Sequence, residues 1–125
     1  MNEIILVIVA HTDDETIGMG GTIARHVFEG DNVFSISMTD GVGARSNHSD
    51  EIVENRQKAA HNASEILGFK WLDNANFPDN SMDSIPLLDV VKFIEAAKEK
   101  VHPTIVYTHS TADLNIDHRI VAEAT

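Results

Sequence analysis

Residues 10–15 read AHTDDE and directly follow the apolar run IILVIV at residues 4–9. A short run of β-branched and apolar residues, with no polar face, is typical of a central strand buried in a parallel sheet. The AHTDDE turn therefore places one imidazole and three carboxylates at the carboxyl end of a buried strand. Open α/β sheets bind their ligands at that edge, so the turn is a candidate site.

The rest of the chain alternates between helical and strand-like patterns. The predicted strands cover residues 4–10, 32–39, 69–72 and 103–107, and the predicted helices lead from the turn to Gly30, over 51–67, from Pro86 to Val101 and through 120–124. This alternation predicts an α/β fold, with a Rossmann-like, doubly wound and mainly parallel sheet in the order 3-2-1-4 and helices on both faces. Core-facing stripes are expected at Ile17, Ile23, Ala24 and Val27, and at Leu87, Leu88, Val91, Ile94 and Val101.

Composition excludes several classes of protein. The 125 residues carry a formal charge of −11 with only nine Lys and Arg, which argues against nucleic-acid binding and against an anionic membrane surface. The chain has no cysteine, so any metal must be held by imidazole and carboxylate groups. The first apolar run is too short to span a bilayer, and its acidic flank is unlike a signal peptide. We therefore expect a cytoplasmic protein with no integral membrane segment.

Two loops are predicted to meet at one crevice. In the order 3-2-1-4 the first and fourth strands are neighbours, and their carboxyl ends lie at the same edge of the sheet. The loop after the fourth strand carries acidic and imidazole side chains, as the AHTDDE turn does. The side chains brought together are His11, Asp13 and Asp14 from the first loop and His109, Asp113, Asp117 and His118 from the second.

Two other interpretations of the turn compete with a site. Thr12 and Glu15 have the spacing of a capping box, and acidic residues are favourable in the first turn of a helix. A dinucleotide site fits less well, because Gly18, Gly20 and Gly21 do not match G-x-G-x-x-G and the carboxylates would repel a phosphate.

The converging loops also contain the ligands of a metal centre. His11, Asp14 and His118 offer two imidazoles and one carboxylate, and a fourth position stays open for water. That composition is typical of a catalytic zinc site rather than a structural one. The same donors accept iron, cobalt or nickel, so the sequence predicts a divalent ion, with zinc as the first choice.

Three motifs together resemble the PIG-L/LmbE-like zinc-dependent de-N-acetylases. They are HTDDE at residues 11–15, TDG at 39–41 and DHR at 117–119, and the resemblance runs over essentially the whole chain. It implies a Rossmann-like fold and the removal of acetyl from N-acetylglucosamine-type groups.

The resemblance also implies roles for individual residues. Asp13 would be the general base, beside a ligand but not itself one. Arg56 and Asp79 match positions where relatives hold substrate hydroxyls or phosphate. The implied metal ligands are His11, Asp14 and His118, and Asp117 is expected to contact a ligand without binding the metal itself.

Three features depart from the family pattern. Relatives usually have proline at the position of Thr12. Many have histidine at the position of Asn115, where it stabilises the transition state, so either Asn115 or His109 would take that work here. The chain also ends at Thr125 within a helical pattern, and we expect one PIG-L/LmbE-like domain over residues 1–125, truncated at its C-terminus.

These observations lead to a ranked set of functions. The first is a metal-dependent hydrolase that removes acetyl from an N-acetyl amino-sugar conjugate, a small-molecule and non-peptide amide. The second is a metal-binding or oligomerising domain without competent catalysis, since truncation would expose apolar surface and favour a homo-oligomer. The third is an α/β interaction module that binds no metal.

Overall fold

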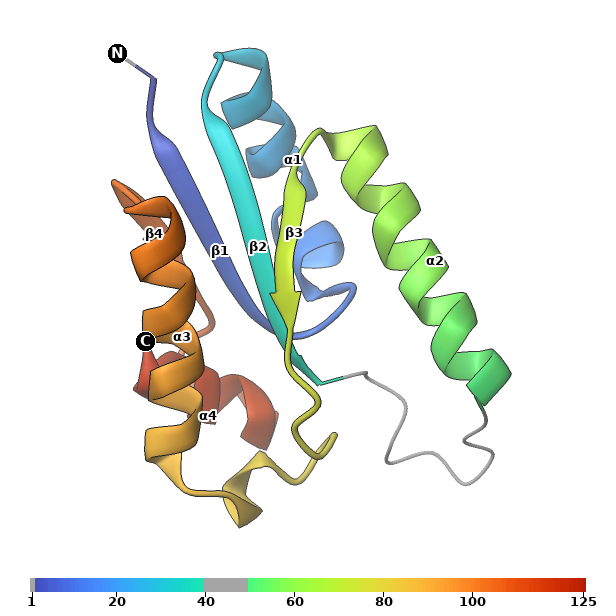
Figure 1. Cartoon of the computed structure of the whole chain (residues 1–125), viewed down its shortest axis with the longest axis vertical. Coiled ribbons are helices and arrows are strands. Elements are labelled where there is room, and N and C mark those ends of the chain that lie inside the picture. Colours follow the sequence, from blue (N-terminus) through green and yellow to red (C-terminus); the bar gives the residue numbers. More distant parts are fainter. Residues whose placement is uncertain (1, 40–49) are drawn as a thin grey trace.

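The computed structural model describes residues 2–39 and 50–125. Its four strands form one parallel sheet in the order β3-β2-β1-β4, which confirms the predicted topology (Figure 1). The strands are β1 (Ile4–His11), β2 (Asn32–Thr39), β3 (Lys70–Asn74) and β4 (Ile105–Tyr107). Asp40 and Gly41 of the TDG motif lie outside the described residues.

Strand β1 is the centre of the sheet. It pairs with β2 on one side and with β4 on the other, and its residues 5–10 are all buried. An apolar side chain at every position is required there because both faces of a central parallel strand are covered.

Helices cover both faces of the sheet, as predicted. Helices α1 (Asp14–Phe28) and α2 (Asp50–Leu67) pack on one face, while α3 (Leu87–Val101) and α4 (Ile116–Ala124) pack on the other (Figure 1). A 3-10 helix, η1 (Met82–Ser84), precedes α3. Two clusters fill the core, one around Ile5, Val7 and Ile23 and the other around Ile8, Ile36 and Val90. Among the described residues, no helix has both the length and the apolar character needed to cross a membrane.

The predicted core stripe of α1 is partly wrong. Ile23 is fully buried, but Ile17 is 81% exposed and Ala24 is exposed as well. Met19 has non-helical angles (φ −148°, ψ 24°), so the helical phase changes between Ile17 and Ile23. A prediction that assumes one uninterrupted helix therefore assigns residues of the two halves to one face, although they lie on different faces.

The predicted core stripe of α3 is also partly wrong. The helix buries Val90, Ile94 and Ala97, while Leu88 is 58% exposed. Both sets have helical spacing and share Ile94, so periodicity alone does not choose between them. The small side chain of Ala97 marks the buried face, although the larger Leu88 has the stronger tendency to point inward.

The segment after β3 is more ordered than its polar composition indicated. We expected residues 73–84 to be irregular, but β3 extends to Asn74 and Met82 is fully buried in the second core cluster. Burial of Met82 anchors this segment against α4. The anchored segment matters because it carries Asp79 and two backbone N–H groups into the candidate site.

A polar cluster ties α1 to the edge strand β4. His26 lies with Nδ1 2.7 Å from Asp31 Oδ2 and with Nε2 2.9 Å from the Tyr107 hydroxyl. Asp31 Oδ1 accepts a hydrogen bond from the backbone N–H of Glu3. That N–H and the His26 ring hold the pKa of Asp31 below its usual value.

This cluster predicts a pH dependence of stability. Because the folded-state pKa of Asp31 is depressed, its contribution to the free energy of unfolding is present above the unfolded value, about 3.9, and is lost as pH falls through the folded pKa. Asp31→Asn is expected to make the acid limb of the stability curve less steep. Denaturant unfolding measured from neutral to acidic pH checks this, and identical acid limbs in the two proteins would contradict it.

Candidate metal centre

Three side chains from three different elements meet at the carboxyl edge of the sheet. His11 ends β1, Asp14 begins α1 and His118 lies in the first turn of α4. Asp14 Oδ2 lies 3.2 Å from His11 Nδ1 and 3.1 Å from His118 Nε2, and those two nitrogens are 3.3 Å apart. The structure thus brings together the three residues that the sequence proposed as ligands.

The spacing of these three atoms suits a tetrahedral metal. Ligands at the usual zinc bond lengths of about 2.0–2.1 Å occupy corners about 3.3–3.4 Å apart. The three distances, 3.2, 3.1 and 3.3 Å, are those of one face of such a tetrahedron. The three donors therefore fit a divalent ion of this size, with the fourth corner left for another ligand.

Electrostatics hold the carboxylate ionised and draw a proton to His11. Burial alone lowers the pKa of His11, but its hydrogen bonds with Asp117 and Asp14 outweigh burial and raise that pKa to about 10. Burial alone raises the pKa of Asp14, but the neighbouring imidazoles of His109 and His11 and the backbone N–H of His11 more than compensate, so that its pKa lies well below the usual range. An ion at this site would take the place of the His11 proton, because a ligand atom must be deprotonated.

Asp117 contacts the His11 ring at Nε2, the nitrogen that does not face Asp14. Its side chain is fully buried, and Oδ2 is 2.9 Å from His11 Nε2. The same carboxylate accepts backbone hydrogen bonds from Asn80 (2.6 Å) and Met82 (3.0 Å). Because these hydrogen bonds hold the carboxylate in place, it fixes the orientation of the His11 ring through Nε2 and leaves Nδ1 facing Asp14.

The turn between His11 and α1 differs from the expected capping box. Asp13, not Thr12, is the N-cap of α1, and no side-chain hydrogen bond caps the helix there. Glu15 does reach back, but its Oε2 accepts from the N–H of Asp13 (3.1 Å). The helix starts too late for Thr12 to cap it, so the predicted capping box is wrong.

Asp13 itself is in a strained conformation. Its φ of 148° and ψ of −23° lie where residues other than glycine are rarely found. Its side chain is 49% exposed, beside the three donors but outside their group. Strain at a half-exposed acidic residue next to a candidate ligand is typical of functional sites.

Glu15 is the buried support of this turn. It is 1% exposed, and its other oxygen accepts from the Thr16 hydroxyl at 3.1 Å. Burial raises the pKa of this carboxyl. The sequence indicated only its helix-terminal position, because nothing in the AHTDDE pattern shows which of three adjacent acids is enclosed.

Arg56 and Asp79, proposed as substrate-binding residues, both contact the turn. Arg56 Nη2 donates to the carbonyl oxygen of Thr12 (2.7 Å) and lies 3.5 Å from Asp13 Oδ2. Asp79 Oδ1 lies 3.2 Å from His11 Nε2, on the same side as Asp117. Arg56 thus contacts the turn beside the donors and Asp79 contacts a donor residue, while their role toward a substrate stays a prediction.

A polar cavity lies beside Arg56. Its volume is about 180 Å³, and hydroxyl and amide side chains from β2, α2 and the end of β3 line it. The lining includes Thr12, Ser37, Thr39, Arg56, Gln57, Asn74 and Asn76. Such a lining offers neutral donors and acceptors together with one guanidinium group.

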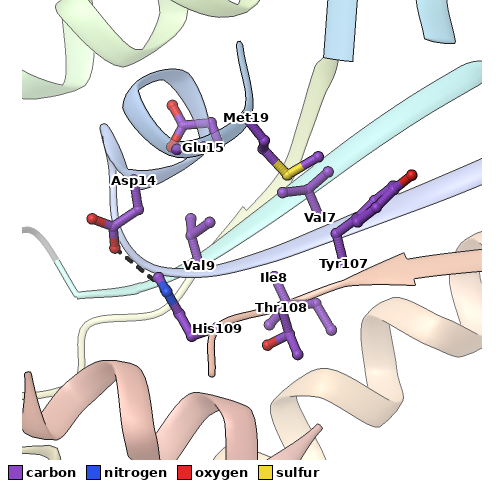
Figure 2. Close-up of a pocket in the computed structure, with 10 residues that line it drawn as sticks. Val7, Ile8, Val9, Asp14, Glu15, Met19, Tyr107, Thr108 and His109 are labelled. Atoms are coloured by element: carbon purple, nitrogen blue, oxygen red, sulfur yellow. Dashed lines mark ion pairs between the residues drawn. The ribbon is translucent and has the colours of Figure 1, made fainter. Parts of the chain in front are cut away.

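His109 and Asn115 have different surroundings. His109 Nε2 accepts from the N–H of Ala10 (3.0 Å) and is 3.4 Å from Asp14 Oδ2, and its ring stacks on His118 at 3.9 Å. Figure 2 shows His109 and Asp14 together at one end of a largely apolar cavity of about 250 Å³. Asn115 is instead the N-cap of α4, and its Oδ1 accepts from the backbone N–H groups of Asp117 and His118.

Asp113 has a predicted place at the crevice but no predicted role. Its Oδ2 is 3.0 Å from His118 Nδ1, on the opposite side of the ring from Asp14. The backbone N–H of Asn115 and the ring of His118 lower the pKa of Asp113. Only the five-residue spacing between Asp113 and His118 could have indicated this contact, and that spacing is common by chance.

Among the described residues, two further groups have donor atoms close enough to share an ion. They are His109 with Asp113 and His118, and His11 with Asp79 and Asp117. The second group would use His11 Nε2, which faces Asp117, a carboxylate that already accepts two backbone hydrogen bonds. Both groups reuse a histidine of the first centre, so they compete with that centre for an ion.

Fold and site together define a class: a doubly wound α/β domain with a candidate metal centre at the carboxyl edge of its central strand. The family model described as PIG-L, GlcNAc-PI de-N-acetylase, matches residues 6–125. The chain belongs to the PIG-L family.

Individual relatives agree with this assignment. The uncharacterized deacetylase YaiS of Escherichia coli (strain K12) is 31% identical, over 97% of this chain and 65% of its own length. The N,N'-diacetylchitobiose deacetylase of Pyrococcus horikoshii superposes with a TM-score of 0.85 at 28% identity, over 98% of this chain and 47% of its own. The conserved protein TT1542 of Thermus thermophilus superposes with a TM-score of 0.82 at 30% identity, over 99% of this chain and 53% of its own. The chain thus spans about half to two thirds of the length of these relatives.

Proposed function

We propose that this chain carries the catalytic site of a metal-dependent deacetylase that hydrolyses the N-acetyl group of an amino-sugar conjugate. The observation that carries the proposal is the spacing of His11 Nδ1, Asp14 Oδ2 and His118 Nε2, which matches one face of a zinc tetrahedron. A bound ion would supply a Lewis acid and lower the pKa of water to about 7.

Asp13 is the residue proposed to move the proton. As a half-exposed carboxylate beside ligand Asp14, it can accept a proton from the attacking water and return it to the departing amine nitrogen. The C–N bond of the amide breaks, a C–O bond forms, and acetate and the free amine leave. The Arg56 guanidinium lies 3.5 Å from Asp13 Oδ2 and can orient this carboxylate.

An N-acetyl amino sugar is proposed as the substrate on two grounds. The family description and the Pyrococcus horikoshii relative both name acetylated glucosamine compounds. The polar cavity beside Arg56 offers hydroxyl, amide and guanidinium groups, which suit sugar hydroxyls. In this proposal Arg56 and Asp79 orient the sugar, and zinc is the resident ion.

The test is acetate release from N-acetylglucosamine and N,N'-diacetylchitobiose, before and after treatment with a chelator. The proposal predicts release that stops on chelation and returns with zinc. A protein that binds zinc and releases no acetate from any such conjugate would instead be the metal-binding domain without catalysis. The cytoplasmic location, a lack of nucleic-acid partners and the homo-oligomer stay predictions from the sequence.

The roles of His109 and Asn115 are distinguished by substituting each residue separately. Asn115 Oδ1 is occupied as the cap of α4, so Asn115→Ala is expected to cost mainly stability, about 0.5–2 kcal/mol. His109→Ala is expected to lower turnover, by about 10²-fold if its ring stabilises the oxyanion. Turnover and thermal unfolding of both variants are compared, and unchanged turnover in His109→Ala would remove His109 from the mechanism.

A further inference from the structure

We propose that Asp113 is a positioning residue that selects the tautomer and orientation of His118, so that the Nε2 lone pair faces Asp14 and His11. The inference rests on the proposed metal centre, which needs a lone pair at that nitrogen. Asp113 is neither one of the three proposed ligands nor the proposed base.

The Asp113 carboxylate is held at both oxygens. Oδ1 accepts from the backbone N–H of Asn115 at 2.9 Å, and Oδ2 lies 3.0 Å from His118 Nδ1. The Asp113 carbonyl oxygen accepts in turn from Arg119 Nη1 at 2.9 Å. An ionised carboxylate only accepts, so its partner Nδ1 carries a proton, and Nε2 is the nitrogen whose lone pair an ion at the centre would take.

Stacking does not make this choice. The His118 ring lies 3.9 Å from the His109 ring with an interplanar angle of 12°. A His118 ring rotated by half a turn would stack equally well, but it would present carbon atoms where the two nitrogens now lie. The present orientation is distinguished by the contacts of Nε2 with Asp14 and His11 and by the contact of Nδ1 with Asp113, and of these three residues only Asp113 lies outside the donor group.

His11 has the complementary arrangement. Asp117 Oδ2 is 2.9 Å from His11 Nε2, which leaves Nδ1 facing Asp14 at 3.2 Å. The two outer carboxylates thus contact opposite nitrogens of the two rings and leave His11 Nδ1 and His118 Nε2 facing Asp14 Oδ2, where an ion would take their lone pairs. Such outer carboxylates fix the tautomer and raise the basicity of histidine ligands.

The competing interpretation makes Asp113 a ligand of an ion shared with His109 and His118. That ion would need lone pairs from both rings at one point, but the two rings stack at 3.9 Å with an interplanar angle of 12°, so their in-plane lone pairs run nearly parallel and do not converge on one ion. Positioning is therefore favoured over ligation.

The experiment uses Asp113→Ala, Asp113→Asn and the control Asp89→Ala, which removes an exposed acid from the first turn of α3. Long-range ¹⁵N–¹H NMR of the metal-free proteins, at mildly alkaline pH, reports the tautomer of His118. Competition titration with a chromophoric chelator reports zinc affinity and stoichiometry. Circular dichroism confirms folding, and Asp113→Asn, which retains an acceptor oxygen, provides the test if Asp113→Ala does not fold.

Wild type and Asp89→Ala are expected to hold the proton on His118 Nδ1. Asp113→Ala is expected to lose that preference and to bind zinc about 10–100-fold more weakly, with Asp113→Asn in between. An unchanged tautomer and zinc affinity in Asp113→Ala would overturn the proposal, as would a second zinc equivalent that disappears with Asp113. If the His118 tautomer changes in Asp113→Ala but the wild-type protein binds no zinc, positioning is supported and the proposed function is contradicted.

Discussion

Asp13→Asn is expected to retain the bound ion and to lose acetate release by about 10²–10⁴-fold, the range that a general base contributes. Asparagine keeps the size and hydrogen-bonding oxygen of Asp13 but cannot accept the proton of the attacking water. Because asparagine is nearly isosteric with aspartate, we expect the turn at φ 148° to be preserved. The measurement is kcat together with the zinc content of the purified variant.

Asp13→Gly separates the proton-transfer role from the backbone strain. Glycine adopts positive φ without penalty, so this variant is expected to lose turnover like Asp13→Asn while relieving some of the strain, of order 1–3 kcal/mol. Thermal unfolding of both variants against wild type measures the gain. Unchanged turnover in Asp13→Asn would remove Asp13 as the base, whatever the effect on stability.

Asp14→Ala is expected to abolish zinc binding and to reduce acetate release to the rate without protein. Asp14 Oδ2 is the atom shared by both imidazole contacts, and it also accepts from the backbone N–H of His11 at 3.0 Å. Its removal takes away the one anionic donor of the centre. The partly buried N–H that remains without its acceptor is expected to cost a further 1–3 kcal/mol, roughly, of stability.

Two variants serve as controls for Asp14→Ala. Asp14→Asn keeps an acceptor for the His11 N–H but lacks the charge, so it is expected to fold like wild type and to bind zinc more weakly. Asp83→Ala removes an exposed acid of η1 and is expected to change neither property. Zinc titration and acetate release are measured on all three, and wild-type zinc affinity in Asp14→Ala would rule out this carboxylate as a ligand.

The sheet order and the meeting of the two loops could be predicted because both follow from strong local signals. β1 is apolar at every position before His11, which only a doubly covered central strand requires, and right-handed crossovers then leave few strand orders. Once β1 and β4 are neighbours, His11, Asp14 and His118 must lie at one edge. This part of the site follows from topology rather than from any side-chain detail.

What could not be predicted depends on interactions between segments distant in sequence. The break at Met19 changes which side of α1 is buried, and the glycines around it permit a kink without requiring one. Asn115 was a candidate substitute for a catalytic histidine, but its Oδ1 caps α4, because the loop enters the helix at that residue. Asp113 and Asp117 both support histidines, and only three-dimensional geometry shows which ring each one contacts.

Zinc-edge anomalous diffraction from crystals of the zinc-loaded protein tests the central claim most directly. We expect one anomalous peak, bonded to His11 Nδ1, Asp14 Oδ2 and His118 Nε2 at about 2.0–2.2 Å. A peak on His11 Nε2 between Asp79 and Asp117, or on Asp113, would place the ion in one of the rival groups and contradict it.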